Sequence, residues 1–152
     1  MRLAIEKTRE GIARGQGPVG CAIARGDTVL AVEHNRVIEQ SDPTAHAEIT
    51  ALRAATRRVG ERHLTGAVVV TTCEPCPMCA GALFFADVAE IYFGASIADL
   101  EAAGFRQLPL RAEQIFALAD STVTLRGGVL SDTCRALLGE WRTANLAADG
   151  EA

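Results

Sequence analysis

The sequence has no apolar run near the ~18–20 residues that a membrane-spanning helix requires. It also contains no internal repeat, no proline- or serine-rich linker and no block of like charges long enough to form a tail. The N-terminus meets charged residues within a few positions and shows no apolar core of a secretory signal. These absences favour one continuous cytoplasmic domain over residues 1–152, with residues 147–152 expected to be frayed.

Positive charge is scarce as well. The chain has 15 lysines and arginines against 19 aspartates and glutamates, for a net charge of −4, which argues against a nucleic-acid-binding surface. Five cysteines form no even-numbered disulfide framework, and three of them, Cys73, Cys76 and Cys79, fall within seven residues. In a reducing compartment that clustering favours a metal site or catalysis. A chain this long needs no metal merely to fold, so a bound metal would serve function.

Periodicity and turn residues predict an α/β fold. The expected helices are 2–14, 45–59, 75–85, 111–118 and 129–145, and the expected strands are 19–24, 28–34, 67–72, 90–94 and 122–126. The first two strands form a hairpin, and residues 95–109 are expected to be a loop. Strands joined through helices are expected to be parallel, so only the first pair should be antiparallel. The result is a three-layer α/β/α domain with a five-stranded mixed sheet, whose site should lie at the carboxyl ends of strands beside helix starts.

Two of these helix starts carry chemistry. One opens with His46, Ala47 and Glu48, and the other with Pro-Cys-Pro-Met-Cys at 75–79. Cysteines three apart on a helix share a face and can point at one ion, and zinc accepts thiolate and imidazole ligands in tetrahedral geometry. Three protein ligands leave a fourth position for water, whose pKa zinc lowers to ~7. Residues two apart on an ideal helix point about 200° from each other, so His46 and Glu48 converge only if the helix begins near His46.

These motifs resemble the H-x-E and P-C-x-x-C pattern of the zinc-dependent cytidine-deaminase superfamily. Residues 35–37, 42–48 and 72–82 are similar to its guanine and tRNA-adenosine deaminase branch, and the resemblance covers most of residues 2–145. It implies that a ring amino group is replaced by oxygen with release of ammonia, and that the protein is a homodimer. It also implies one zinc ion per chain, with Glu48 moving protons beside the metal ligands His46, Cys76 and Cys79.

Residues 98–105 resemble guanine deaminases, in which an acidic side chain of this region helps to read the N–H edge of the purine. Asp99 and Glu101 are both candidates, because a carboxylate suits the N–H donors of guanine. Asn35 resembles the base-binding asparagine of the family, and Trp141, the single tryptophan, could close the pocket. The remaining candidate substrate-binding residues are Ala47 and Phe105. For Phe105 and Trp141, packing in the core or at a dimer contact is the alternative interpretation.

The resulting hypothesis is a zinc hydrolase that converts free guanine to xanthine. Cytosine and other aminated rings such as aminotriazines share the zinc motifs and remain alternatives. A tRNA adenosine deaminase is less favoured because the final helix lacks the lysines and arginines expected for RNA binding. The alternatives of another class are a closed structural zinc site, with Cys73 or another thiol as the fourth ligand, and a non-catalytic zinc-binding module.

Overall fold

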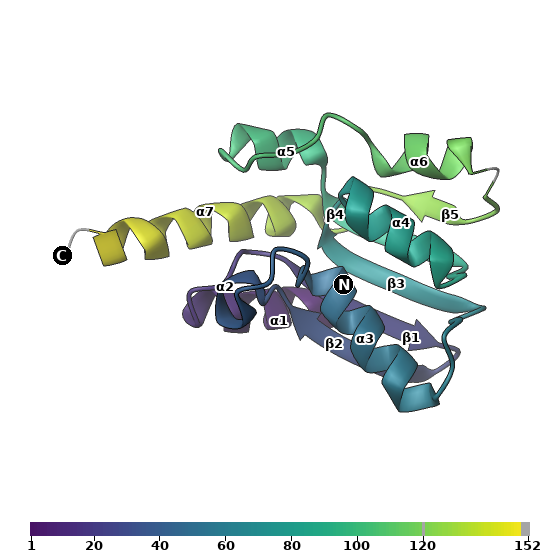
Figure 1. Ribbon diagram of the computed structural model, residues 1–152. Helices are drawn as coiled ribbons and strands as arrows, with labels where there is room; N and C mark the ends of the chain where they lie inside the picture. Colours follow the sequence, from purple (N-terminus) through teal and green to yellow (C-terminus); the bar gives the residue numbers. More distant parts are fainter. Residues whose placement is uncertain (120, 150–152) are drawn as a thin grey trace.

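The computed structural model describes residues 1–119 and 121–149 (Figure 1). Helices and strands alternate through these ranges. The elements are α1 (Arg2–Ala13), β1 (Gly20–Arg25), β2 (Thr28–His34), α2 (Val37–Gln40), α3 (Ala47–Val59), β3 (Ala67–Cys73), α4 (Pro77–Phe85), β4 (Glu90–Ala95), α5 (Ile97–Ala102), α6 (Ala112–Leu118), β5 (Thr124–Arg126) and α7 (Ser131–Asp149).

The five strands form one mixed sheet in the order β2-β1-β3-β4-β5. β1 is antiparallel to both β2 and β3, whereas β3, β4 and β5 are parallel to one another. The prediction that only the hairpin would be antiparallel is therefore wrong. The helical crossover through α3 does join two strands of the same direction, but β1 lies between them, so β2 and β3 are not neighbours.

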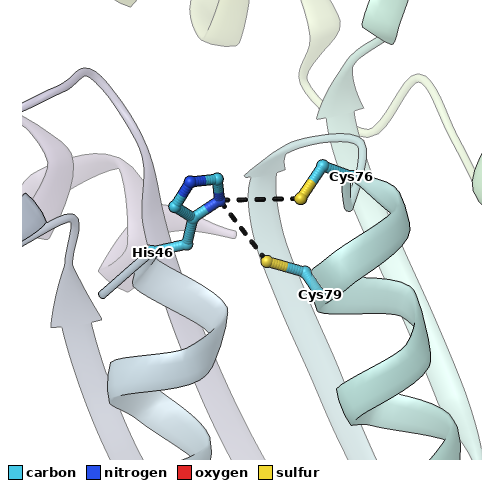
Figure 2. A group of neighbouring side chains, drawn as sticks. All are labelled: His46, Cys76 and Cys79. Atoms are coloured by element: carbon cyan, nitrogen blue, oxygen red, sulfur yellow. Dashed lines mark hydrogen bonds between the residues drawn. The ribbon is translucent and has the colours of Figure 1, made fainter. Parts of the chain in front are cut away.

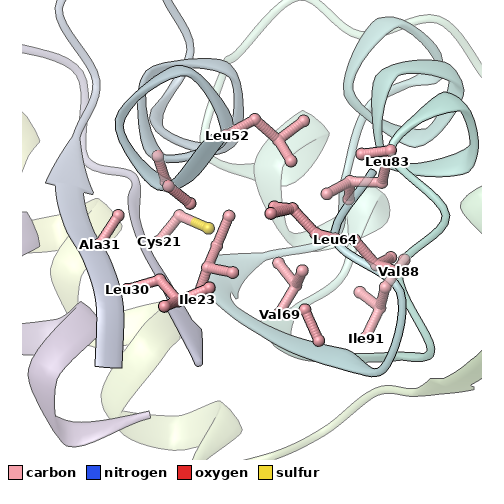
Figure 3. Close-up of a cluster of buried hydrophobic side chains, with 14 of the residues drawn as sticks. Cys21, Ile23, Leu30, Ala31, Leu52, Leu64, Val69, Leu83, Val88 and Ile91 are labelled. Atoms are coloured by element: carbon pink, nitrogen blue, oxygen red, sulfur yellow. The ribbon is translucent and has the colours of Figure 1, made fainter. Parts of the chain in front are cut away.

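Helices cover both faces of the sheet, which confirms the three-layer α/β/α prediction. α3 and α4 pack on one face, where Ile23, Val69 and Ile91 of the strands meet Leu52 and Leu83 of the helices (Figure 3). On the opposite face, α1 and α7 pack together and enclose a second apolar cluster, which includes Ile5, Cys134, Leu137 and Leu138. Cys21 and Cys134 are fully buried in these two clusters, as expected of small hydrophobic side chains.

Two short helices lie in segments without a helical pattern. α2 has four residues and α5 has six, which is too short for apolar periodicity to show. α5 lies inside the predicted 95–109 loop and is started by a capping box: the Asp99 N–H donates to Ser96 Oγ over 3.2 Å, and the Ser96 N–H donates to Asp99 Oδ2 over 2.7 Å.

The last helix is longer than predicted. α7 continues to Asp149, four residues beyond the predicted end at 145. The expected fraying of residues 147–152 stays a prediction, and residues 150–152 lie outside the described residues. Within the part of the chain that the structure describes, no helix is long and apolar enough to cross a membrane.

Candidate metal centre and cavity

Two helix N-termini meet at the edge of the sheet where β3 ends. α3 begins at Ala47 and α4 at Pro77, so His46 and Cys76 are the N-cap residues, both with extended backbone. The expectation that the helix carrying Glu48 begins near His46 is confirmed. The partial positive charge of the two helix ends favours thiolate ligands at this place.

Three potential ligand atoms converge between these helices. The Nδ1 atom of His46 lies 3.6 Å from Sγ of Cys76 and 3.6 Å from Sγ of Cys79 (Figure 2). All three atoms lie within 4.8 Å of one another. Zn–S and Zn–N bonds of about 2.3 and 2.0–2.1 Å at a tetrahedral angle give an S···N separation of about 3.6 Å. The donor set and its spacing therefore fit a zinc ion.

The two thiols differ in acidity. The hydrogen bond from Cys79 and the contact with His46 lower the pKa of Cys76 to about 4, although burial opposes the shift. The hydrogen bond to Cys76 raises the pKa of Cys79, and burial adds to the increase. The pKa of His46 is raised by its hydrogen bond with Cys76. These contacts favour the thiolate form of Cys76, and a bound divalent cation would displace the proton of the other thiol.

Glu48 lies in the first turn of α3 and is only 3% exposed. Burial raises the pKa of its carboxyl to about 7, and the charge of Cys76 contributes to the increase. A carboxyl group that titrates near neutral pH can both accept and return a proton.

Cys73 is the thiol nearest in sequence that could serve as the fourth ligand of a closed structural zinc site. It is a buried thiol at the end of β3, and burial raises its pKa. It lies outside the group of converging donors formed by His46, Cys76 and Cys79. Two of the three donors, His46 and Cys76, line a cavity, so the donor group has a side open to water or substrate, as a catalytic zinc site requires.

A cavity of about 430 Å³ adjoins the donor group, a volume in the range of small-molecule sites. Its walls are mainly apolar, with His46, Glu48 and Cys76 among its lining residues. The other lining residues are Gly17, Pro18, Val19, Asn35, Val37, Ile38, Cys73, Glu74, Pro77, Met78, Leu100, Phe105, Arg106, Gln107, Leu108 and Trp141.

Three of the predicted substrate-binding residues line this cavity. Asn35 follows β2, and its Oδ1 accepts a hydrogen bond from the Val37 N–H over 3.1 Å. Phe105 and Trp141 pack against each other with ring centroids 4.8 Å apart, which brings α7 to the cavity. Ala47, in contrast, is fully buried at the start of α3 and is not part of the cavity wall.

Neither acidic candidate lines the cavity. The carboxylate of Asp99 accepts hydrogen bonds from the backbone and hydroxyl of Ser96 and lies 4.0 Å from Arg135. Glu101 is exposed on α5. The capping box fixes Asp99 in the first turn of α5, so the expectation that one of these carboxylates reads the base finds no support in the arrangement of this chain.

Sequence reasoning missed three polar residues of the cavity wall, namely Glu74, Arg106 and Gln107. Glu74 directly precedes the Pro-Cys-Pro-Met-Cys motif, and a charged residue at the end of a buried strand was an available signal. Arg106 and Gln107 lie in an irregular segment between α5 and α6, where no periodicity indicates which side chains face inward.

Residues 1–95 match the family model described as the cytidine and deoxycytidylate deaminase zinc-binding region. This range contains all three converging donors and Glu48. The chain belongs to this family and is a zinc-dependent deaminase.

Its relatives include deaminases of two substrate classes. The chain is 38% identical over 106 residues to a guanine deaminase of Bacillus subtilis, a match that covers 69% of this chain and 68% of the relative. It is 40% identical over 95 residues to a tRNA-specific adenosine deaminase of Agrobacterium fabrum, covering 62% of each chain. Among solved structures, a guanine deaminase from Nitrosomonas europaea superposes with a TM-score of 0.85 and 31% identity, covering 92% of this chain and 81% of that one. The comparisons therefore show that the reaction is a deamination. They do not distinguish guanine from adenosine in tRNA as the substrate.

Proposed function

We propose that this protein acts in the cytoplasm as a single nucleobase deaminase domain, converting guanine and water to xanthine and ammonia. The observation that carries the proposal is the cavity of about 430 Å³, which is lined by the zinc donors His46 and Cys76 and by the buried Glu48. Similarity to guanine deaminases in both sequence and structure supports guanine as the base. The net charge of −4 supports a small uncharged substrate over RNA.

In this proposal His46, Cys76 and Cys79 hold the zinc ion. When bound, zinc supplies a Lewis acid that activates a water molecule at neutral pH. Glu48 accepts the proton of the attacking water and delivers it to the departing nitrogen, which leaves as ammonia. The Nδ2 group of Asn35 is available to hold the base, because the Oδ1 atom is occupied by the Val37 N–H.

Replacing Glu48 with glutamine tests this role. Glu48→Gln keeps the size of the side chain but cannot carry the proton, so turnover should fall by about 10²–10⁴-fold while one zinc ion per chain is retained. Ammonia release and metal content, measured on the same preparation, check this expectation. The exposed Glu113→Gln is the matched control and should keep wild-type turnover. Unchanged turnover in Glu48→Gln would contradict catalysis at this site and favour a non-catalytic zinc module.

The substrate is tested by ammonia release from guanine, cytosine, adenine, ammeline and a tRNA anticodon stem-loop. Turnover dominated by guanine supports the proposal. Turnover of cytosine or the triazine alone would retain the zinc chemistry and overturn guanine as the substrate. The 40% identity to a tRNA-specific adenosine deaminase makes adenosine in the stem-loop the second candidate. Inosine formation there, without guanine turnover, would establish that candidate instead.

We also propose that the protein is a homodimer. Phe85 and Leu118, near the ends of α4 and α6, are 77% and 84% exposed, and Phe84 beside them is 37% exposed. A second copy that covers these side chains would remove apolar surface from water. Light scattering should give twice the chain mass of 16.0 kDa, and a monomeric mass would contradict the dimer.

A further inference from the structure

Several polar groups around the cavity already have partners. The carboxylate of Glu74 accepts hydrogen bonds from the Ile97 N–H, the Arg111 guanidinium and the Ala112 N–H, each over 3.0–3.1 Å. The Oδ1 atom of Asn35 is also occupied. Among the cavity-lining residues that the structure describes, Glu48 is therefore the one carboxylate without a full set of protein partners.

Gln107 is the contrasting case. It lines the cavity and is half-buried, and its amide forms no hydrogen bond with any side chain or backbone group that the structure describes. A side-chain amide carries both donors and an acceptor, so it can bind the edge of a heterocyclic base. The Gln107 side chain is partly exposed and lines the cavity, so its donors are free to hydrogen-bond a molecule that enters there.

The loop that carries Gln107 is attached at both ends. At one end, the Phe105 N–H donates to the Leu100 carbonyl over 3.0 Å, and the Phe105 ring packs against Trp141. At the other end, Arg111 and the Ala112 N–H bind Glu74. Glu74 lies two residues before Cys76. Its contacts with Arg111 and Ala112 therefore fix the loop next to the chain segment that carries the metal ligand Cys76.

The shape of guanine indicates what such an amide would meet. Deamination at C2 requires C2 to face the metal centre and Glu48. The opposite edge then presents O6 and N7, both hydrogen-bond acceptors. These atoms need N–H donors, which the amides of Gln107 and Asn35 provide, and a carboxylate would repel them.

We infer that Gln107 is a specificity-determining residue, whose side-chain amide donates a hydrogen bond to the O6 and N7 edge of the base while Asn35 binds it from the end of β2. This inference rests on the proposed function and names the group that selects its substrate. Gln107 thus takes the base-reading role that the sequence suggested for Asp99 or Glu101, which lie outside the cavity wall.

The test measures binding apart from turnover. Glu48→Gln serves as the zinc-loaded parent that binds without reacting, and the fluorescence of Trp141, the single tryptophan and a cavity residue, reports ligand binding. Gln107→Leu in this parent should weaken guanine binding about tenfold or more, because it removes one of the two amide donors and leaves an acceptor of the O6 and N7 edge unpaired. Gln107→Glu should reverse the preference, so that 2,6-diaminopurine, which carries an amino donor in place of O6, binds more tightly than guanine.

The matched control is Gln40→Leu, which removes an exposed amide on α2 outside this cavity and should leave guanine affinity unchanged. Equal zinc content and equal melting temperatures would show that the Gln107 variants are folded. Unchanged guanine affinity in Gln107→Leu, or an unchanged ligand preference in Gln107→Glu, would overturn the inference and leave the proposed function intact. No guanine binding by the parent, together with no ammonia from guanine with the wild type, would overturn both.

Discussion

At the scale of single residues, Glu74 joins parts of the chain that are distant in sequence. It follows the last residue of β3 and is 5% exposed. Its carboxylate binds the first backbone N–H groups of both α5 and α6, where the partial positive charge of a helix end favours an anion. The Arg111 guanidinium provides a charged partner. These contacts hold the 103–111 loop over the cavity.

Glu74→Ala should therefore destabilise the protein by about 2–4 kcal/mol, because it leaves buried N–H groups without an acceptor. Urea unfolding at neutral pH measures the change in the free energy of unfolding. Glu113→Ala removes an exposed carboxylate of α6 and should change it by less than about 0.5 kcal/mol. If the two variants proved equally stable, the three hydrogen bonds of Glu74 could not be what anchors the loop.

At the scale of elements, α5 is a six-residue helix that depends on its N-terminal cap. Hydrogen bonds from Ser96 lower the pKa of Asp99, and the charge of Arg135 contributes to the decrease. A carboxyl group with a lowered pKa in the folded state stabilises that state above its unfolded pKa. This contribution is lost as the pH falls through the folded pKa.

Asp99→Ala should therefore be less stable than the wild type at neutral pH, and the difference should shrink below about pH 4. Urea midpoints of both proteins, recorded at neutral pH and at about pH 3, provide the measurement. Wild type and variant must be compared in the same buffers, since other carboxyl groups titrate in this range. A stability difference that stayed constant across the two conditions would show that the ionised carboxylate does not hold the cap.

At the scale of the whole molecule, the metal donors connect the two helices that cover one face of the sheet. His46 precedes α3, whereas Cys76 and Cys79 belong to the start of α4, 30 residues further along the chain. An ion bound by all three stabilises the folded state, because the unfolded chain does not hold the donors together.

Removing zinc with a chelator should lower the melting temperature. A metal at 100 times its dissociation constant contributes about 2.7 kcal/mol to the free energy of unfolding. Scanning calorimetry with and without added zinc measures this contribution. Cys76→Ser should melt near the temperature of the chelated wild type and respond little to zinc. A wild-type melting temperature that did not depend on zinc would argue against these three residues as the ligands.

The sequence by itself determined the features that depend on neighbours along the chain. Helical periodicity, β-branched runs and glycine turns place most of the helices and strands within a few residues of their observed bounds. The metal donors were predictable for the same reason, because Cys76 and Cys79 share one helical turn and His46 stands directly before a helix. Local geometry alone brings such residues to the N-terminus of their helix.

The tertiary structure decided what depends on contacts between distant segments. Which strands pair is settled by the packing of both sheet faces, so the position of β1 between β2 and β3 has no local signal. Side-chain directions around irregular backbone also lack a local signal, because no periodicity indicates which residues face inward. The structure shows that Gln107 lines the cavity, whereas Asp99 caps α5. The reaction class therefore follows from short motifs, and the residues that select the substrate follow from the long-range packing that positions the loop.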